Sequence, residues 1–157
     1  MTPPRNRFTI PVFPHVKKFI QKKYRAPGAG TVVVKTEEYT TLGKLVTLAL
    51  RDARQWTEYN TIHRKQLSET IVLHLTVEQM KLGPKISKLL RLNVDMDREF
   101  KSHLVSWIHA GTAVGIAPFN SCKNYLIYHK IDEKEYSLDA AYKYWQRVSK
   151  GDPEEEN

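Results

Sequence analysis

The spacing of apolar residues changes near residue 80, and this change decides the fold class. Before it, three short runs rich in β-branched and aromatic residues, at 8–13, 31–35 and 69–75, are typical of strands. Helical spacing separates these runs, and only helical spacing follows Gly83 and Pro84. The sequence therefore predicts an α+β protein with a small N-terminal three-stranded sheet, two basic-faced helices and a helical C-terminal half. We expect residues 1–80 and 81–150 to pack as one compact domain, followed by an acidic tail at 151–157.

Each helix predicted in the first half has an apolar face opposite a basic one. Pro11 restricts the first strand to a sheet edge, and Pro14 suits the first turn of a helix. In that helix the apolar positions are Val16, Phe19, Ile20 and Tyr24. In the next helix, capped by Thr40 or Thr41, they are Leu42, Leu45, Val46, Ala49 and Ala53. The outward basic positions of the two helices are Lys18, Lys22, Arg25, Lys44 and Arg51.

Four further helices are expected in the second half. A short one covers 85–92, and a longer one, capped by Asn93 or Asp95, ends at Ala110 and Gly111. A third runs from Pro118 to about Tyr128, and a last one is capped by Ser137. The core positions expected in the last three are Phe100, Leu104, Trp107, Ile108, Phe119, Cys122, Tyr125, Leu126, Leu138, Ala141, Tyr142, Trp145 and Val148.

The break at 111–115 also permits a helix-turn-helix, whose second helix would offer Asn120, Ser121, Lys123 and Asn124 to DNA. Pro118 is awkward inside a recognition helix. We therefore favour a plain helical packing unit.

Charge is distributed unevenly along the chain. All charged residues before Glu37 are basic, while the last seven residues hold four acids and no base. Removing these four acids from the net charge of +8 leaves residues 1–150 at +12. Such a body indicates an anionic partner, and nucleic acid fits best, with DNA favoured over RNA. The candidate phosphate-binding residues are Lys17, Lys18, Lys22, Lys23, Arg25, Lys44, Arg51, Arg54, Arg64, Lys65, Lys85, Lys88 and Arg91.

Two aromatic residues lie among these cations. Trp56 and Tyr59 are flanked by Arg51, Arg54 and Arg64, an arrangement that could stack unpaired bases. Large aromatics more often pack in a core, and that alternative stays open for Trp56. Trp107 and Trp145 fall on apolar stripes and are expected in the core.

Sequence motifs typical of enzymes are weak in this chain. The turn at 27–31 precedes a strand, whereas a phosphate-binding glycine loop follows a strand and opens a helix. Tyr125 and Tyr128 lack a neighbouring metal motif, and Cys122 lies on an apolar face, so we expect neither a catalytic residue nor a metal or other cofactor. One cysteine forms no intrachain disulfide, and no apolar run is long enough to cross a bilayer. These features favour a protein of a reducing cytoplasm that does not bind membranes.

The C-terminal third resembles short, basic, mostly uncharacterised proteins of bacteriophages and mobile elements. The resemblance rests on Phe100, Gly111, Phe119, Tyr125 and Ile127, an acidic turn, and the ending at 141–147. It implies a setting in the DNA transactions of such elements or in virion assembly, in a bacterial host cytoplasm or a virion.

These observations lead us to expect a non-enzymatic nucleic-acid-binding accessory or regulatory protein that contacts mainly phosphates. The alternative is a structural or adaptor protein, either a homo-oligomer or a component of a larger assembly such as a virion. A small nuclease-like enzyme is the third hypothesis.

Overall fold

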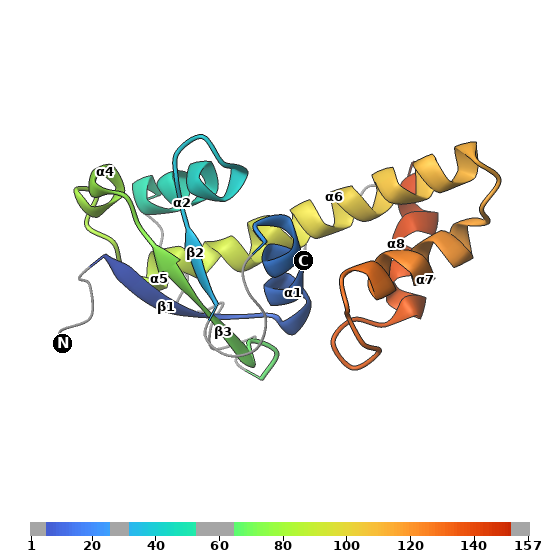
Figure 1. Ribbon diagram of the computed structural model, residues 1–157, viewed down its shortest axis with the longest axis horizontal. Helices are drawn as coiled ribbons and strands as arrows, with labels where there is room; N and C mark the ends of the chain where they lie inside the picture. The colour runs from blue at the N-terminus through green and yellow to red at the C-terminus, as the bar shows by residue number, and fades with distance from the viewer. Residues whose placement is uncertain (1–5, 26–31, 53–64, 152–157) are drawn as a thin grey trace. The chain divides into compact units, whose positions relative to one another are not determined.

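The computed structural model describes residues 6–25, 32–52 and 65–151 (Figure 1). The chain forms two compact units, Met1–Asp97 and Arg98–Asn157. The boundary lies inside helix α6 (Arg91–Ala113), so residues 81–97 belong to the N-terminal unit rather than to a separate helical half. The packing of the two parts as one compact domain stays a prediction.

The N-terminal unit contains the expected three-stranded sheet, and the α+β class is confirmed. Strands β1 (Arg7–Val12), β2 (Val33–Lys35) and β3 (Glu69–His74) are ordered β1-β3-β2 (Figure 1). The central strand β3 is antiparallel to β1 and parallel to β2. Pro11 lies in the edge strand β1, as its missing N–H requires.

Helices α1 (Pro14–Lys23) and α2 (Thr41–Arg51) follow β1 and β2. The predicted cap is confirmed, since the Thr40 hydroxyl accepts a hydrogen bond from the Gly43 amide at 3.0 Å. Leu50 belongs to the buried face of α2, whereas Leu45, expected there, is only partly buried. Ala53 lies outside the described residues.

The short helix α4 (Val77–Met80) was not predicted, and it places a polar side chain in the core. Gln79 is fully buried, and its amide nitrogen donates to the carbonyl oxygens of Thr36 at 2.9 Å and Gly43 at 3.2 Å. Its amide oxygen accepts from the Thr36 hydroxyl at 2.7 Å. Gly43 must lack a side chain, because a Cβ there would lie 1.9 Å from the Glu37 carbonyl oxygen. These contacts hold the start of α2 against the end of β2.

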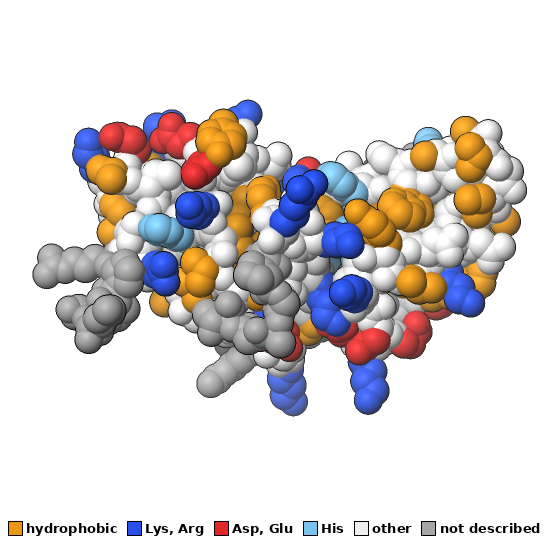
Figure 2. Space-filling view, in the orientation of Figure 1, with side chains coloured by type: hydrophobic (Ala, Val, Ile, Leu, Met, Phe, Trp, Pro, Cys, Tyr) orange, Lys and Arg blue, Asp and Glu red, His pale blue; other side chains and the backbone are white. Residues whose placement is uncertain are grey.

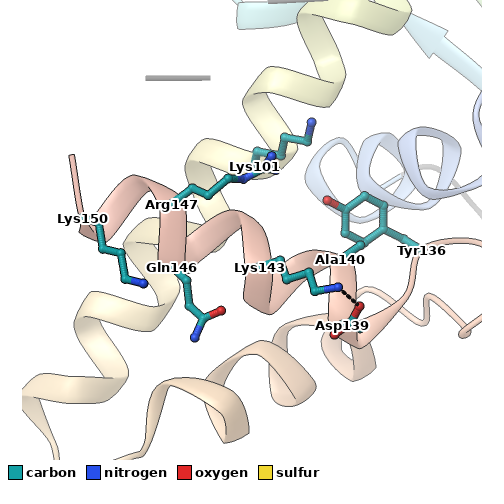
Figure 3. Close-up of a pocket in the computed structure, with 8 residues that line it drawn as sticks. All are labelled: Lys101, Tyr136, Asp139, Ala140, Lys143, Gln146, Arg147 and Lys150. Atoms are coloured by element: carbon teal, nitrogen blue, oxygen red, sulfur yellow. Dashed lines mark ion pairs between the residues drawn. The ribbon is translucent and has the colours of Figure 1, made fainter. Parts of the chain in front are cut away.

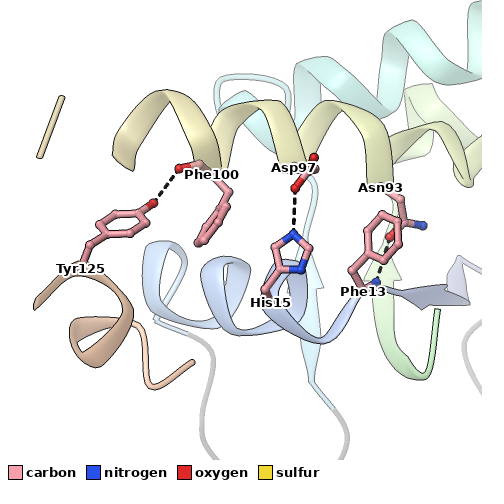
Figure 4. A network of polar contacts seen from close by, with 6 residues as sticks. All are labelled: Phe13, His15, Asn93, Asp97, Phe100 and Tyr125. Atoms are coloured by element: carbon pink, nitrogen blue, oxygen red, sulfur yellow. Dashed lines mark hydrogen bonds and ion pairs between the residues drawn. The ribbon is translucent and has the colours of Figure 1, made fainter. Parts of the chain in front are cut away.

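Helices α5 (Ile86–Leu89) and α6 follow, and the predicted cap at Asn93 or Asp95 is wrong because α6 begins at Arg91. Asn93 is instead buried, where its amide accepts from the Phe13 N–H at 3.2 Å and donates to the Pro11 carbonyl at 2.9 Å. One turn further along α6, Asp97 Oδ1 lies 2.7 Å from His15 Nε2 (Figure 4). These hydrogen bonds and this ion pair therefore connect the first turns of α6 to the end of β1 and the start of α1.

In the C-terminal unit, the end of α6 packs with α7 (Pro118–Tyr128) and α8 (Leu138–Ser149). The buried Tyr125 hydroxyl donates to the Phe100 carbonyl oxygen at 2.7 Å (Figure 4). Ser137 caps α8 as predicted, accepting from the Ala140 amide at 3.0 Å. The predicted helix end at Gly111 is wrong, because α6 continues to Ala113.

Two expected positions on α7 are reversed. Phe119 is 48% exposed, although it was expected in the core. Ser121, which the helix-turn-helix alternative would offer to DNA, is buried. A Cβ at Gly111 would lie 2.3 Å from Ser121 Oγ, so only small residues fit where α6 meets α7.

Candidate nucleic-acid interface

All thirteen candidate cations fall within the N-terminal unit, and the structure describes eleven of them. Arg54, Arg64, Trp56 and Tyr59 lie outside the described residues, so the stacking platform stays a prediction. The described cations divide into those that stabilise the fold and those that face solvent.

Lys17, Lys88 and Arg91 bind named groups of the protein itself. Lys17 Nζ lies 3.2 Å from Glu69 Oε2, at the start of β3. Lys88 donates to the Leu50 carbonyl oxygen at 3.2 Å, and Arg91 Nη1 lies 3.1 Å from Asp52 Oδ2. The last two contacts place positive charge at the C-terminus of α2, the negative end of its dipole. We therefore assign Lys17, Lys88 and Arg91 a structural role.

The Arg91 guanidinium also forms a second ion pair. Its Nε lies 3.2 Å from Asp95 Oδ2, one turn further along α6. A guanidinium between two carboxylates has little net charge to offer a phosphate. The sequence prediction grouped Arg91 with the outward cations because it placed Arg91 and Asp95 in different helices, and because Asp52 lies 39 residues away in the chain.

The other described candidates lie at the surface of several elements. Lys18 and Lys22, one turn apart on α1, are partly exposed and exposed, and Lys44 and Arg51, two turns apart on α2, are both exposed. Lys23 Nζ lies 5.8 Å from the ring centroids of both Phe19 and Tyr24. The remaining exposed candidates are Arg25, Lys65 and Lys85.

The expected geometry, with basic positions opposite the apolar stripe, therefore holds on both α1 and α2. On the face seen in Figure 2, Lys and Arg side chains are scattered over the N-terminal unit among acidic and apolar ones. This distribution suits several separate contacts along a charged backbone better than one deep anion site.

The C-terminal unit holds a basic pocket that the candidate residues did not include. It has a volume of about 550 Å³ and is lined by Lys101 of α6, by Lys143 and Arg147 of α8, and by Lys150, the C-cap of α8 (Figure 3). Lys143, Arg147 and Lys150 were expected to face outward, and their spacing of four and three was the signal that they share one face. Lys101 joins them through helix packing, which no local pattern reports.

The residues considered as nucleophiles are poorly suited to that role. Burial raises the pKa of the Cys122 thiol to about 11. Burial also raises the pKa of the Tyr125 hydroxyl far above its ordinary value. Both groups are therefore protonated at neutral pH. Within the described ranges, no group of three or more His, Cys, Asp or Glu side chains could hold a metal ion.

The chain was compared with known protein families, proteins and structures. Neither protein-family models, curated proteins nor solved structures give a significant match to the chain. In the part of the chain that the structure describes, no helix is long and apolar enough to span a membrane.

Proposed function

We propose that the protein is a non-enzymatic accessory or regulatory protein that binds nucleic acid, mainly through phosphates. The observation that supports this function is the division among its cations. Lys17, Lys88 and Arg91 are used within the fold, whereas Lys44 and Arg51 are exposed on the face of α2 opposite the core. Phosphate binding requires exposed cations of this kind.

DNA is the partner we expect. The resemblance to bacteriophage and mobile-element proteins implies a setting in DNA transactions, and the basic surface is spread over α1 and α2. Contacts to phosphates fix position and register but carry no direct sequence information. Binding through these cations would therefore be of similar strength on different sequences.

A salt series tests the proposal. About five phosphate contacts on duplex DNA predict a slope of log K against log salt of about −4 to −5. The double variant Lys44→Gln/Arg51→Gln should reduce the magnitude of the slope by about 2 and weaken binding to unrelated sequences alike. Fluorescence anisotropy with labelled duplexes measures both quantities.

Lys81→Gln is the matched control for charge. Lys81 is exposed on the same unit and lies 3.3 Å from Glu78, outside the proposed interface. It should change affinity by less than about twofold, since an exposed ion pair contributes little. A flat salt response of the wild type would remove the proposal.

A second function, as a structural or adaptor protein of a larger assembly, is favoured by a different observation. Large apolar side chains are exposed on the C-terminal unit, among them Val114 at 76%, Ile127 at 63% and Phe119 at 48% (Figure 2). Contiguous apolar patches mark protein interfaces, and this second function requires these side chains to form such a patch. A stable complex free of nucleic acid in size-exclusion chromatography with light scattering, together with a flat salt response, would favour this function.

A further inference from the structure

The basic pocket of the C-terminal unit is formed by two helices. Figure 3 shows Lys101 entering from α6, while Lys143 and Arg147 come from successive turns of α8 and Lys150 from its C-cap. Tyr136, which precedes α8 in the chain, also lines the pocket, and Gln146 contributes its side-chain amide. Its volume, about 550 Å³, is large enough for a small phosphorylated group.

Charge in this pocket is strongly unbalanced. Four basic side chains line it against one carboxylate, Asp139, which leaves a net charge of +3. The Asp139 Oδ2 atom is already engaged, 3.0 Å from Lys143 Nζ. Among the described residues, Arg147 forms no ion pair or hydrogen bond through its guanidinium. The pocket therefore offers more positive charge than its own acid compensates.

Helix stability accounts for only part of this arrangement. Arg147 and Lys150 lie at the C-terminus of α8, where positive charge complements the helix dipole. That effect does not require Lys101, which belongs to another helix and lines the same pocket beside Arg147 (Figure 3). Lys101 Nζ also lies 5.3 Å from the Tyr144 ring centroid, a contact that keeps it next to α8. Bringing like charges together costs free energy unless an anion lies between them.

We propose that this pocket binds a phosphate group. Arg147 would contact two phosphate oxygens through its planar guanidinium, and Lys101 and Lys150 would add point charges. The phosphate could belong to a nucleic-acid backbone or to a free phosphorylated small molecule, since both present the same oxygens. This inference goes beyond the proposed function, because the pocket lies in the other compact unit and shares no residue with the candidate interface.

Two binding measurements test the pocket. Isothermal titration calorimetry with pyrophosphate probes the free ligand, and anisotropy with duplex DNA probes the backbone. Arg147→Gln should weaken at least one of these interactions about tenfold, as expected for the loss of a charged bidentate contact. Lys123→Gln is the matched control, because Lys123 is exposed on α7 in the same unit and does not line the pocket. It should change neither affinity by more than about twofold.

The pattern of losses identifies the source of the phosphate. A loss of DNA affinity specific to Arg147→Gln indicates the nucleic-acid backbone, whereas a loss confined to pyrophosphate indicates a free small molecule. If neither affinity responds more to Arg147→Gln than to Lys123→Gln, the pocket proposal is wrong. If Arg147→Gln lowers the melting temperature, the same two affinities are measured for Lys101→Gln, on the other helix, and an unchanged affinity for both ligands then contradicts the pocket proposal. Failure of the proposed function is seen separately, in the Lys44 and Arg51 variant.

Discussion

Cys122 is a buried ionisable residue whose titration can be followed through the stability of the protein. Its side chain is fully buried on α7, and burial raises the pKa of the thiol to about 11. In the unfolded chain the thiol titrates near its ordinary pKa of about 8.5. Between these values the folded state holds a proton that the unfolded state has lost, so the free energy of unfolding falls as pH rises.

We therefore expect stability to decline between about pH 8.5 and 10, by up to about 1.4 kcal/mol per pH unit from this group. Urea unfolding at several pH values measures the decline. Cys122→Ala lacks the thiol and should show a shallower dependence, whatever the cost of the cavity. Tyr125, whose pKa is also raised, acts equally in both proteins and only above about pH 10. Parallel curves for the two proteins would refute the argument.

The burial of some single residues could not be predicted from local sequence patterns. Hydrophobicity placed Phe119 inside, and the helix-turn-helix alternative placed Ser121 outside, whereas Phe119 is exposed and Ser121 is buried. The cause is the close approach of α7 to Gly111, where a Cβ would lie 2.3 Å from Ser121 Oγ. Likewise, the outward positions of Lys44 and Arg51 follow from helical spacing, but the pairing of Lys17 with Glu69, 52 residues away, depends on tertiary packing.

At the scale of elements, the sequence predicted what local chemistry determines. Thr40 and Ser137 cap α2 and α8 as expected, because the side chain and the amide that it accepts from are three residues apart. Helix α4 was missed because four residues carry too little periodicity, although Thr76 and Gln79 form a capping box there. Asn93 resembled a cap, yet its side chain bonds the Phe13 N–H and the Pro11 carbonyl, which are 80 and 82 residues away.

The contact of Asn93 with the end of β1 predicts a large effect for Asn93→Ala. The substitution leaves the Phe13 amide and the Pro11 carbonyl without their partner, so we expect a loss of about 2–3 kcal/mol in the free energy of unfolding. Chemical denaturation measures the loss, and faster hydrogen exchange at the Phe13 amide would locate it.

Asn124→Ala provides the control for the chemical change alone. Asn124 is exposed on α7, and its loss should alter stability by less than about 0.5 kcal/mol. Equal stability of the two variants would show that the Asn93 hydrogen bonds contribute nothing beyond those made with water.

For the whole molecule, the sequence predicted the fold class but placed the division of the chain at residue 80. The compact units divide between Asp97 and Arg98, inside α6. The apolar spacing of α6 continues across this point, so it predicts one helix and cannot report which partners each half of the helix contacts. The same limit applies to the pocket, since Lys101 and α8 are brought together only by packing.

The distribution of charge over the whole chain leads to a last prediction, which concerns the acidic tail. Asp152, Glu154, Glu155 and Glu156 follow directly after Gly151, in a chain whose other residues carry +12. Their charges can compete with an external polyanion for the basic surface. At about 20 mM salt, where the Debye length is about 20 Å, deleting residues 152–157 should tighten non-specific DNA binding about threefold.

The advantage should disappear at about 0.15 M salt, where the Debye length is about 8 Å. Anisotropy titrations of both proteins across this range measure the change. A full-length variant with Glu154→Gln, Glu155→Gln and Glu156→Gln separates charge from length, because it keeps every residue of the tail and removes three of the four acids. Competition requires this variant to follow the truncated protein at low salt. If its affinity matches that of the wild type at every salt concentration, the tail carries only solubilising charge.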